Sequence, residues 1–248
     1  CEEHGKQERY EQVLGHLQAN DDDDNSGEAD DGVALVVEIV GQTNRHRFND
    51  GSSSHKIAGM AAVESQMLEL GTPAPEFSLP DPDGQLHSLP EKASAFLVMF
   101  ICNHCPFVKH IRTELAQLGR DYGGRDVAIV AINSNDVDNY PADGPEQMRQ
   151  EVIDQGYNFP YLLDADQSVA KAYRAACTPD FYLFNADRKL VYRGQLDGSR
   201  PGNSVPVDGR DLRAALDAVL AGRPVNNDQA PSIGCNIKWS PGNEPDYY

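Results

Sequence analysis

Two continuous apolar runs mark the predicted core of the chain. They are "AFLVMFI" at residues 95–101 and "VAIVAI" at residues 127–132. Runs without polar interruption are typical of strands buried on both faces in a sheet that contains parallel pairs. Directly after the first run, apolar residues recur at helical spacing, namely Val108, Ile111, Leu115 and Leu118. The pattern therefore predicts a buried strand followed at once by a helix.

The alternation of strands and helices continues toward the C-terminus. Further strands are expected near "FPYLL" and, joined by an "NADR" turn, at "DFYLF" and "KLVYRG". Further helices are expected at residues 145–155, 167–175 and about 209–221. Ahead of the first strand, "EFSLPDPDGQLHSL" alternates with a period of two on either side of Asp83-Gly84, which predicts a hairpin. The expected fold class is α/β, with a mixed central sheet flanked by helices and an N-terminal hairpin.

Three segments differ in composition. Residues 1–59 are acidic and polar around one short apolar run, so we expect a largely disordered N-terminal extension there. The regular pattern occupies residues 60–222, which we interpret as the functional domain. Residues 223–248 are rich in Pro, Gly and Asn, and we expect an irregular C-terminal tail over the surface.

The charge of the chain limits its partners. Its 39 Asp and Glu residues against 21 Lys and Arg give a net charge of -18, and no stretch gathers the basic residues of a nucleic-acid site. The apolar runs are far shorter than the roughly 20 residues of a membrane-spanning helix. The start, "CEEHGKQERY", lacks the pattern of a secretion signal, and five cysteines are too few for a disulfide scaffold. We therefore expect a cytoplasmic protein without nucleic-acid or membrane partners.

The stretch richest in chemistry is "FICNHCPFVKH" at residues 100–110. It places Cys102 where the strand ends and Cys105 where the helix begins. The N-terminus of a helix favours negative charge, and the thiolate is the form of cysteine that attacks disulfides and peroxides. The pattern predicts a redox pair in which Cys102 attacks and Cys105 closes the disulfide. His104, between them, is a polarisable neighbour of the pair or an exposed loop residue.

The same residues leave metal binding open as an alternative. Two cysteines with His104 or His110 offer soft ligands that suit copper(I) or zinc. The sequence singles out no distant histidine to complete such a site, so we assign no metal ligand and no cofactor. The polar stretch "NSND" at residues 133–136, after the second strand, is interpreted as turn-forming.

Four stretches taken together carry a family resemblance. They are "LGTPAPEFSLPDPDG", "FICNHCPF", "AINSND" and "CTPDFYLF". With these, the chain resembles the redoxin branch of the thioredoxin-like superfamily, near the alkyl hydroperoxide reductase/thiol-specific antioxidant family and the TlpA-type proteins. The resemblance covers roughly residues 68–222 and implies a thioredoxin-like sandwich with a thiol-redox role. The strand and helix inserted between the cysteine pair and Pro179 also match this branch.

The resemblance implies roles for residues near "CTPDFYLF". In this superfamily a proline ahead of the hairpin's first strand takes the cis form and lies against the cysteine pair. Thr178-Pro179 stands at that place, so these residues are expected to line the substrate groove. Cys177, two residues before the proline, and Cys235, in "PSIGCNIKW", are candidate auxiliary thiols or buried structural ones.

Two departures from the family pattern leave the reaction open. The family's peroxidases carry P-x-x-x-T/S-x-x-C, which neither cysteine of the pair has. Thioredoxins have Trp where Ile101 stands and a buried acid in the preceding strand, where "AFLVMFI" has none. The expected function is that of a thiol-disulfide oxidoreductase in cell redox homeostasis, with a thiol-dependent peroxidase or a copper- or zinc-binding protein as alternatives. The expected partners are a protein disulfide, small thiol or peroxide substrate and an electron-donating thiol reductant.

Overall fold

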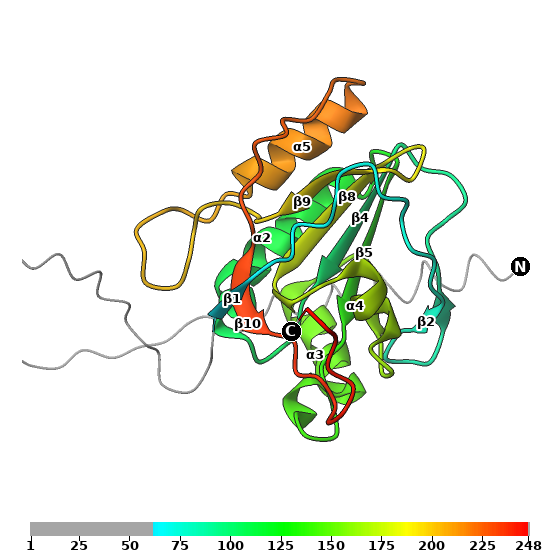
Figure 1. The fold of residues 1–248 in the computed structure, drawn as a ribbon, viewed down its shortest axis with the longest axis vertical. Coiled ribbons are helices and arrows are strands. Elements are labelled where there is room, and N and C mark those ends of the chain that lie inside the picture. The colour runs from blue at the N-terminus through cyan, green and yellow to red at the C-terminus, as the bar shows by residue number, and fades with distance from the viewer. Residues whose placement is uncertain (1–61, 248) are drawn as a thin grey trace, which may run out of the picture. The chain divides into compact units, whose positions relative to one another are not determined.

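The computed structural model describes residues 62–247, and the predicted extension at residues 1–59 lies outside them. A five-stranded mixed sheet forms the centre of this part (Figure 1). Its strands are β4 (Ala95–Phe100), β5 (Val127–Asn133), β6 (Tyr161–Leu163), β8 (Asp180–Asn185) and β9 (Leu190–Gly194). In the order β6-β5-β4-β8-β9, the first three strands run parallel, and β8 is antiparallel to both β4 and β9.

Helices cover both faces of the sheet. They are α2 (Pro106–Tyr122), α3 (Pro145–Gln155), α4 (Ser168–Tyr173) and α5 (Arg210–Leu220), with the short 3-10 helix η1 (Pro141–Asp143). Side chains of α2, α3 and α5 share one core cluster, and those of α4 belong to a second. Strand β4 contributes side chains to both clusters, with Leu97 and Met99 in the first and Phe96 and Phe100 in the second. The predicted α/β sandwich is confirmed, and burial on both faces explains the uninterrupted apolar run of β4.

The predicted N-terminal hairpin is also present. Strand β2 (Leu79–Pro80) pairs antiparallel with β3 (Leu86–His87). Gly84 lies in the turn with a φ of 82° and donates its N–H to the carbonyl oxygen of Asp81. Glycine adopts this left-handed conformation without steric cost, which is why Asp-Gly marks such a turn in the sequence.

The C-terminal segment is more regular than predicted. A second sheet has the order β1-β10-β7, formed by β1 (Ala62–Glu64), β10 (Ile233–Asn236) and β7 (Cys177–Thr178). Beyond β10, Trp239 is buried in the second core cluster. The prediction of an irregular tail was wrong for this strand. Gly234 does not mark a loop, because it allows β10 to pack closely on β7: a Cβ at this position would lie 2.0 Å from the Thr178 carbonyl oxygen. Both partners of β10 are distant in sequence, so no local pattern predicts the pairing.

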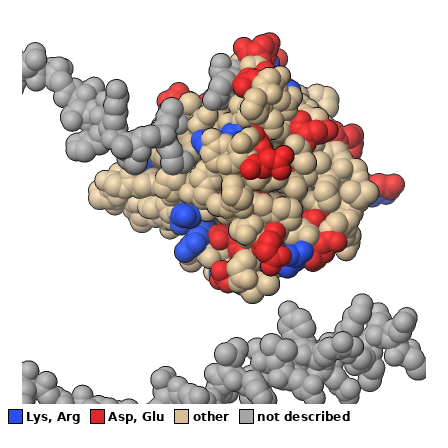
Figure 2. Space-filling view, turned by 90° about the horizontal axis from the view of Figure 1, so that it is seen from below, with Lys and Arg blue, Asp and Glu red and all other residues tan. Residues whose placement is uncertain are grey.

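The surface carries the acidic excess of the composition. On the face shown in Figure 2, acidic side chains outnumber basic ones, and the basic side chains lie in small groups. Among residues 62–247, no helix combines the length and the apolar character that crossing a membrane requires.

Asp180, at the start of β8, is a carboxyl group inside the core. It is fully buried, with the Tyr182 hydroxyl donating to Oδ2 at 2.9 Å and the Phe181 N–H donating to Oδ1 at 3.1 Å. Desolvation raises its pKa to about 8, although these hydrogen bonds act in the opposite direction. Asp180 pairs with Phe100. A buried acid is thus present in the strand next to β4, although β4 itself has none.

We expect an Asp180→Asn variant to change the pH dependence of stability. The folded protein keeps the Asp180 proton up to a pH of about 8, whereas an unfolded chain releases it near pH 4, so this group makes stability fall as pH rises between these values. Wild type should lose about 1 kcal/mol more unfolding free energy than the variant between pH 6 and pH 7. Denaturant unfolding at both pH values measures the difference. Asp187→Asn, in an exposed turn, is the matched control, and equal pH slopes for wild type and Asp180→Asn would contradict a protonated Asp180.

Candidate functional site

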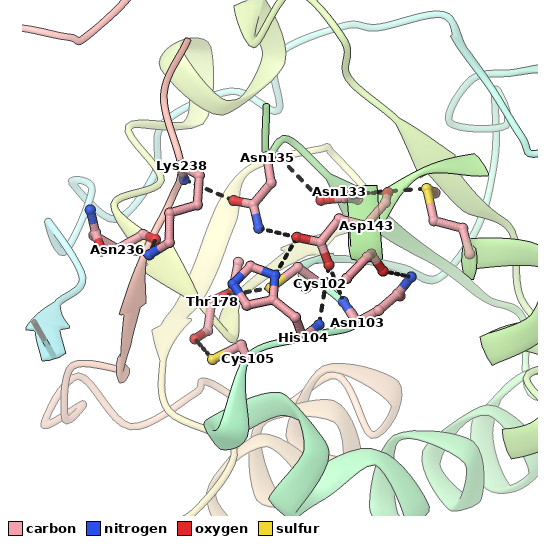
Figure 3. Close-up of polar contacts among 12 residues, drawn as sticks. Cys102, Asn103, His104, Cys105, Asn133, Asn135, Asp143, Thr178, Asn236 and Lys238 are labelled. Carbon is pink, nitrogen blue, oxygen red and sulfur yellow. Dashed lines mark hydrogen bonds and ion pairs between the residues drawn. The ribbon is translucent and has the colours of Figure 1, made fainter. Parts of the chain in front are cut away.

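The two cysteines of "CNHC" lie at the junction of β4 and α2 (Figure 3). Cys102 follows β4 by two residues, and Cys105 is the N-cap of α2, directly before Pro106. Proline suits this first helical position because no N–H is left unpaired there. Both cysteines are free thiols, with exposed fractions of 2% and 0%. The predicted order of strand, cysteine pair and helix is confirmed.

Thr178 and Pro179 meet the cysteine pair from the other side of the site. The peptide bond between them is cis. The Thr178 hydroxyl oxygen lies 3.3 Å from Cys102 Sγ, and the Thr178 carbonyl oxygen accepts a hydrogen bond from Cys105 Sγ at 3.2 Å (Figure 3). One residue thus contacts both sulfur atoms. The structure brings together residues 76 and 73 positions apart in the chain.

A buried carboxylate, Asp143 of η1, holds the loop between the cysteines (Figure 3). Its Oδ1 accepts the backbone N–H groups of Asn103 and His104 at 2.8 and 3.1 Å. Its Oδ2 lies 2.5 Å from His104 Nδ1 and accepts the Asn135 side-chain amide at 2.7 Å. His104 also stacks on Tyr140, with ring centroids 5.7 Å apart. His104 is therefore a fixed part of the site, half-buried between a carboxylate and a ring.

The sequence did not single out Asp143. It lies 38 residues beyond the pair, and "NYPADG" has the composition of an ordinary loop. The "NSND" stretch also does more than form a turn, since Asn133 and Asn135 are buried and Asn133 donates to the backbone carbonyl of Asp143 at 2.7 Å. Buried polar residues at the end of a parallel strand were the available signal, because the carboxyl ends of such strands form ligand-binding crevices.

Asp143 remains ionised despite its burial. Desolvation alone would raise the pKa of its carboxyl group, but the hydrogen bonds from His104 and Asn135 outweigh it and leave the pKa below its usual range. The resulting negative charge also raises the pKa of the nearby Cys102 thiol, adding to burial and the contact with Cys105.

The two thiols of the pair differ in acidity. Burial, followed by the hydrogen bond to Cys105, raises the pKa of Cys102. The pKa of Cys105 is lowered because the Cys102 and Cys235 thiols and the Val108 N–H can all donate to its sulfur. The N-terminus of α2 therefore lowers the pKa of Cys105 most directly. From the sequence we expect this effect at Cys102.

The two other predicted thiols lie on opposite sides of the β7-β10 ladder. Cys235 is opposite Thr178 in the register, contacts Cys105, and shares the core cluster of the pair. Cys177 is opposite Asn236, and its thiol donates to the carbonyl oxygen of Pro179 at 3.7 Å. Both are buried. Cys235 thus joins the pair, while Cys177 points elsewhere.

Three side chains at the site could ligate a metal ion. One ligand atom each from Cys102, His104 and Asp143 lie within 4.8 Å of one another. Sulfur, imidazole nitrogen and carboxylate oxygen together suit zinc. His110, the alternative metal ligand in the sequence, does not belong to this group, and its Nε2 lies 2.7 Å from the Ser199 hydroxyl oxygen.

Solved structures resemble the chain over most of its described part. An uncharacterized conserved protein from Geobacillus kaustophilus is 57% identical, with a TM-score of 0.73, over 74% of this chain and 99% of that one. A protein from Chlorobium tepidum assigned as thiol:disulfide interchange protein DsbE is 19% identical, with a TM-score of 0.51, over 62% of this chain and 99% of that one. The second similarity concerns the fold alone, which is thioredoxin-like.

Sequence comparison identifies the family. Thiol-disulfide oxidoreductase ResA of Bacillus subtilis (strain 168) is 28% identical over 127 residues, which are 51% of this chain and 67% of ResA. The family model for AhpC/TSA matches residues 70–193. That range contains β4, the cysteine pair, Asp143 and Thr178-Pro179. The chain therefore belongs to the AhpC/TSA family and carries its thioredoxin-like fold.

Proposed function

We propose that the protein is a thiol-disulfide oxidoreductase that works through Cys102 and Cys105. The observation that carries the proposal is the contact of Thr178 with both sulfur atoms at the N-terminus of α2. Sequence similarity to a thiol-disulfide oxidoreductase supports the same reaction class. The substrate is a disulfide of a protein or a small molecule, and a thiol reductant restores the pair.

Two proton arrangements are available to the pair, and Thr178 serves one of them with both of its oxygen atoms. With the negative charge on Cys105, the Cys102 and Cys235 thiols and the Val108 N–H stabilise it. When the Cys102 proton passes to Cys105, the Cys105 thiol donates to the Thr178 carbonyl and the Thr178 hydroxyl donates to the Cys102 thiolate. We assign the attack to the second arrangement, because in it the two oxygen atoms of Thr178 hydrogen bond to both sulfur atoms and leave the negative charge on Cys102.

The reaction then takes two exchange steps. The Cys102 thiolate attacks one sulfur of the substrate, the substrate S–S bond breaks, and its other sulfur leaves as a thiolate that takes up a proton. Cys105 loses its proton and attacks Cys102 in the mixed disulfide, releasing the second substrate thiol. The protein has given two electrons and holds a Cys102–Cys105 disulfide. A thiol reductant reverses these steps.

A shallow surface depression lies beside Pro179. Phe107, Ile111, Phe181 and Leu196 contribute apolar surface, and Arg200 lies at the same depression. Pro179 directly follows Thr178, which contacts both sulfur atoms, so we expect the groups that flank a bound disulfide to lie against this surface. The loop that carries Leu196 and Arg200 therefore helps to define the substrate.

Trapping the mixed disulfide tests the proposal. A Cys105→Ser variant should accumulate a covalent adduct with insulin, used as a model protein disulfide, because Cys102 attacks and nothing resolves the product. Non-reducing electrophoresis and mass spectrometry locate the bond at Cys102. Cys102→Ser is the matched control and should form no adduct. Adduct formation by neither variant, together with rapid consumption of hydrogen peroxide by wild type, would replace the proposal with the thiol-dependent peroxidase.

Zinc binding is a second candidate function, favoured by the grouping of Cys102, His104 and Asp143. A metal ion held by these side chains would compete with His104 for the carboxylate of Asp143 and would block the Cys102 sulfur. Elemental analysis of protein purified without chelator, followed by zinc titration with free thiols counted at each step, examines this. Stoichiometric zinc that protects Cys102 from alkylation supports it, and metal-free protein that retains its reactive thiols through the titration contradicts it.

A further inference from the structure

A third thiol is in contact with the redox pair. Cys235 lies on β10, directly opposite Thr178 in the antiparallel ladder, so the two side chains share one face of that sheet. Thr178 contacts Cys102 Sγ at 3.3 Å and Cys105 Sγ at 3.2 Å, so the register places Cys235 beside the pair. The Cys105 thiol is also the largest cause of the raised pKa of Cys235. All three cysteines belong to one core cluster.

We propose that Cys235 is a third redox thiol, which takes the disulfide from the pair as a Cys105–Cys235 bond and returns Cys102 to the thiol form. This inference rests on the proposed function, since it needs a Cys102–Cys105 disulfide to start from. It adds a step that occurs inside the protein after the substrate has left.

The step is a balanced thiol-disulfide exchange. The Cys235 thiolate attacks Cys105, the Cys105–Cys235 bond forms, and the Cys102–Cys105 bond breaks. Cys102 leaves as a thiolate and takes the proton that Cys235 gave up. The number of disulfides stays at one, so no external oxidant or reductant enters.

Oxidation of Cys105 to a disulfide makes the attack by Cys235 easier. In the reduced protein, the hydrogen bond to Cys105 is the largest cause of the raised pKa of Cys235. Once Cys105 is bound in a disulfide it carries no negative charge, and this cause disappears. Cys235 then ionises more readily when the sulfur that it attacks has become electrophilic.

Position distinguishes Cys235 from the other buried thiol nearby. Cys177 stands next to Thr178 in β7, and successive residues of a strand point to opposite faces. Its thiol donates to the Pro179 carbonyl, and it is outside the core cluster of the pair. Cys177 is therefore the natural control for any effect of removing a buried thiol.

Close packing on both sides of β10 holds Cys235 in a fixed position. Its Gly234 lies against the Thr178 carbonyl so closely that no larger residue fits without a shift. On the other side, β10 pairs with β1 through Cys235 and Ala62. The thiol is therefore held in register with the pair by two ladders, and a disulfide formed there lies out of reach of bulk solvent.

Disulfide mapping of full-length variants tests the inference. A Cys102→Ser variant treated with one equivalent of diamide, a thiol oxidant, should lose two free thiols and give a linked Cys105–Cys235 peptide by mass spectrometry. Adding Cys177→Ser should leave this link intact, and adding Cys235→Ser should abolish it. Circular dichroism melts confirm that each reduced variant is folded.

Wild type supplies the second measurement. After oxidation by one equivalent of insulin disulfide and alkylation, a fraction of molecules should carry the Cys105–Cys235 link with alkylated Cys102, and this fraction should fall to zero in Cys235→Ser. A Cys102→Ser variant that stays reduced, or wild type in which Cys235 is always the alkylated residue, would overturn the inference. A Cys102–Cys105 link in Cys235→Ser shows in either case whether the proposed function stands.

Discussion

A Cys102→Ser variant is expected to lose disulfide reductase activity by at least about 10³-fold in kcat/KM, because the nucleophile itself is removed. A serine hydroxyl is not ionised near neutral pH and cannot form the mixed disulfide. The core should tolerate the change, since the serine can still hydrogen bond to the Thr178 hydroxyl that now lies 3.3 Å from the sulfur. Insulin reduction followed by turbidity, with kcat/KM from initial rates, measures the loss.

Two other cysteine variants make that result specific. Cys177→Ser removes a similarly buried thiol and should leave kcat/KM within a few-fold of wild type, since its sulfur donates to the Pro179 carbonyl and the residue lies outside the core cluster of the pair. Cys105→Ser should keep the first attack and stop after one mixed disulfide per molecule. Activity of Cys102→Ser close to that of wild type would assign the attack to another thiol.

The parts of the fold that the sequence predicts are those with local causes. Burial on both faces leaves β4 uninterrupted by polar residues, and the helical spacing from Val108 follows from the one apolar face of α2. The Asp83-Gly84 turn needs a left-handed residue, which glycine supplies. The cysteine pair is recognisable because both sulfur atoms come from one strand-to-helix junction.

The parts that the sequence does not predict depend on contacts between distant segments. Strand β10 is four residues long, and its partners begin 171 and 56 positions earlier in the chain. Nothing in "PSIGCNIKW" indicates that Cys235 will face Cys105. Asp143 is likewise one acid among 39 Asp and Glu residues, and only the folded chain shows that it receives two backbone N–H groups of the cysteine loop.

Two of the buried carboxyl groups, Asp180 and Asp143, show why residue type alone does not predict the protonation state. Asp180 has two hydroxyl groups, of Tyr182 and Ser232, and one backbone N–H as partners, and desolvation prevails, so it keeps its proton. Asp143 has two backbone N–H groups, an amide and an imidazole, and these prevail over desolvation. The same side chain is thus neutral in the sheet and ionised at the cysteine loop, because the number and kind of its hydrogen-bond partners differ.

An Asp143→Ala variant should lower the free energy of unfolding by about 3–5 kcal/mol, the cost of breaking a buried and fully hydrogen-bonded charge. The loss leaves the N–H groups of Asn103 and His104 and the Asn135 amide without their acceptor. The lowered pKa of Asp143 adds a pH dependence. Its stabilisation is present above the usual carboxyl pKa near 4 and is lost as pH falls through the lower folded value. Denaturant unfolding at neutral and acid pH measures both effects.

The Asp143→Asn variant separates the charge from the shape of the side chain. It keeps one acceptor oxygen for the loop N–H groups, so it should be less destabilised than Asp143→Ala and should lack the acid-dependent part of the wild-type curve. It should also lower the pKa of Cys102, because the Asp143 charge is one of the causes that raise it. The pH profile of Cys102 alkylation by iodoacetamide measures this change, since only the thiolate reacts.

Asp121→Asn, at a surface pair with Arg213, is the matched control and should alter neither the profile nor the stability to a comparable extent. An unchanged alkylation profile in Asp143→Asn would show that this carboxylate only holds the loop and does not set the acidity of the attacking thiol.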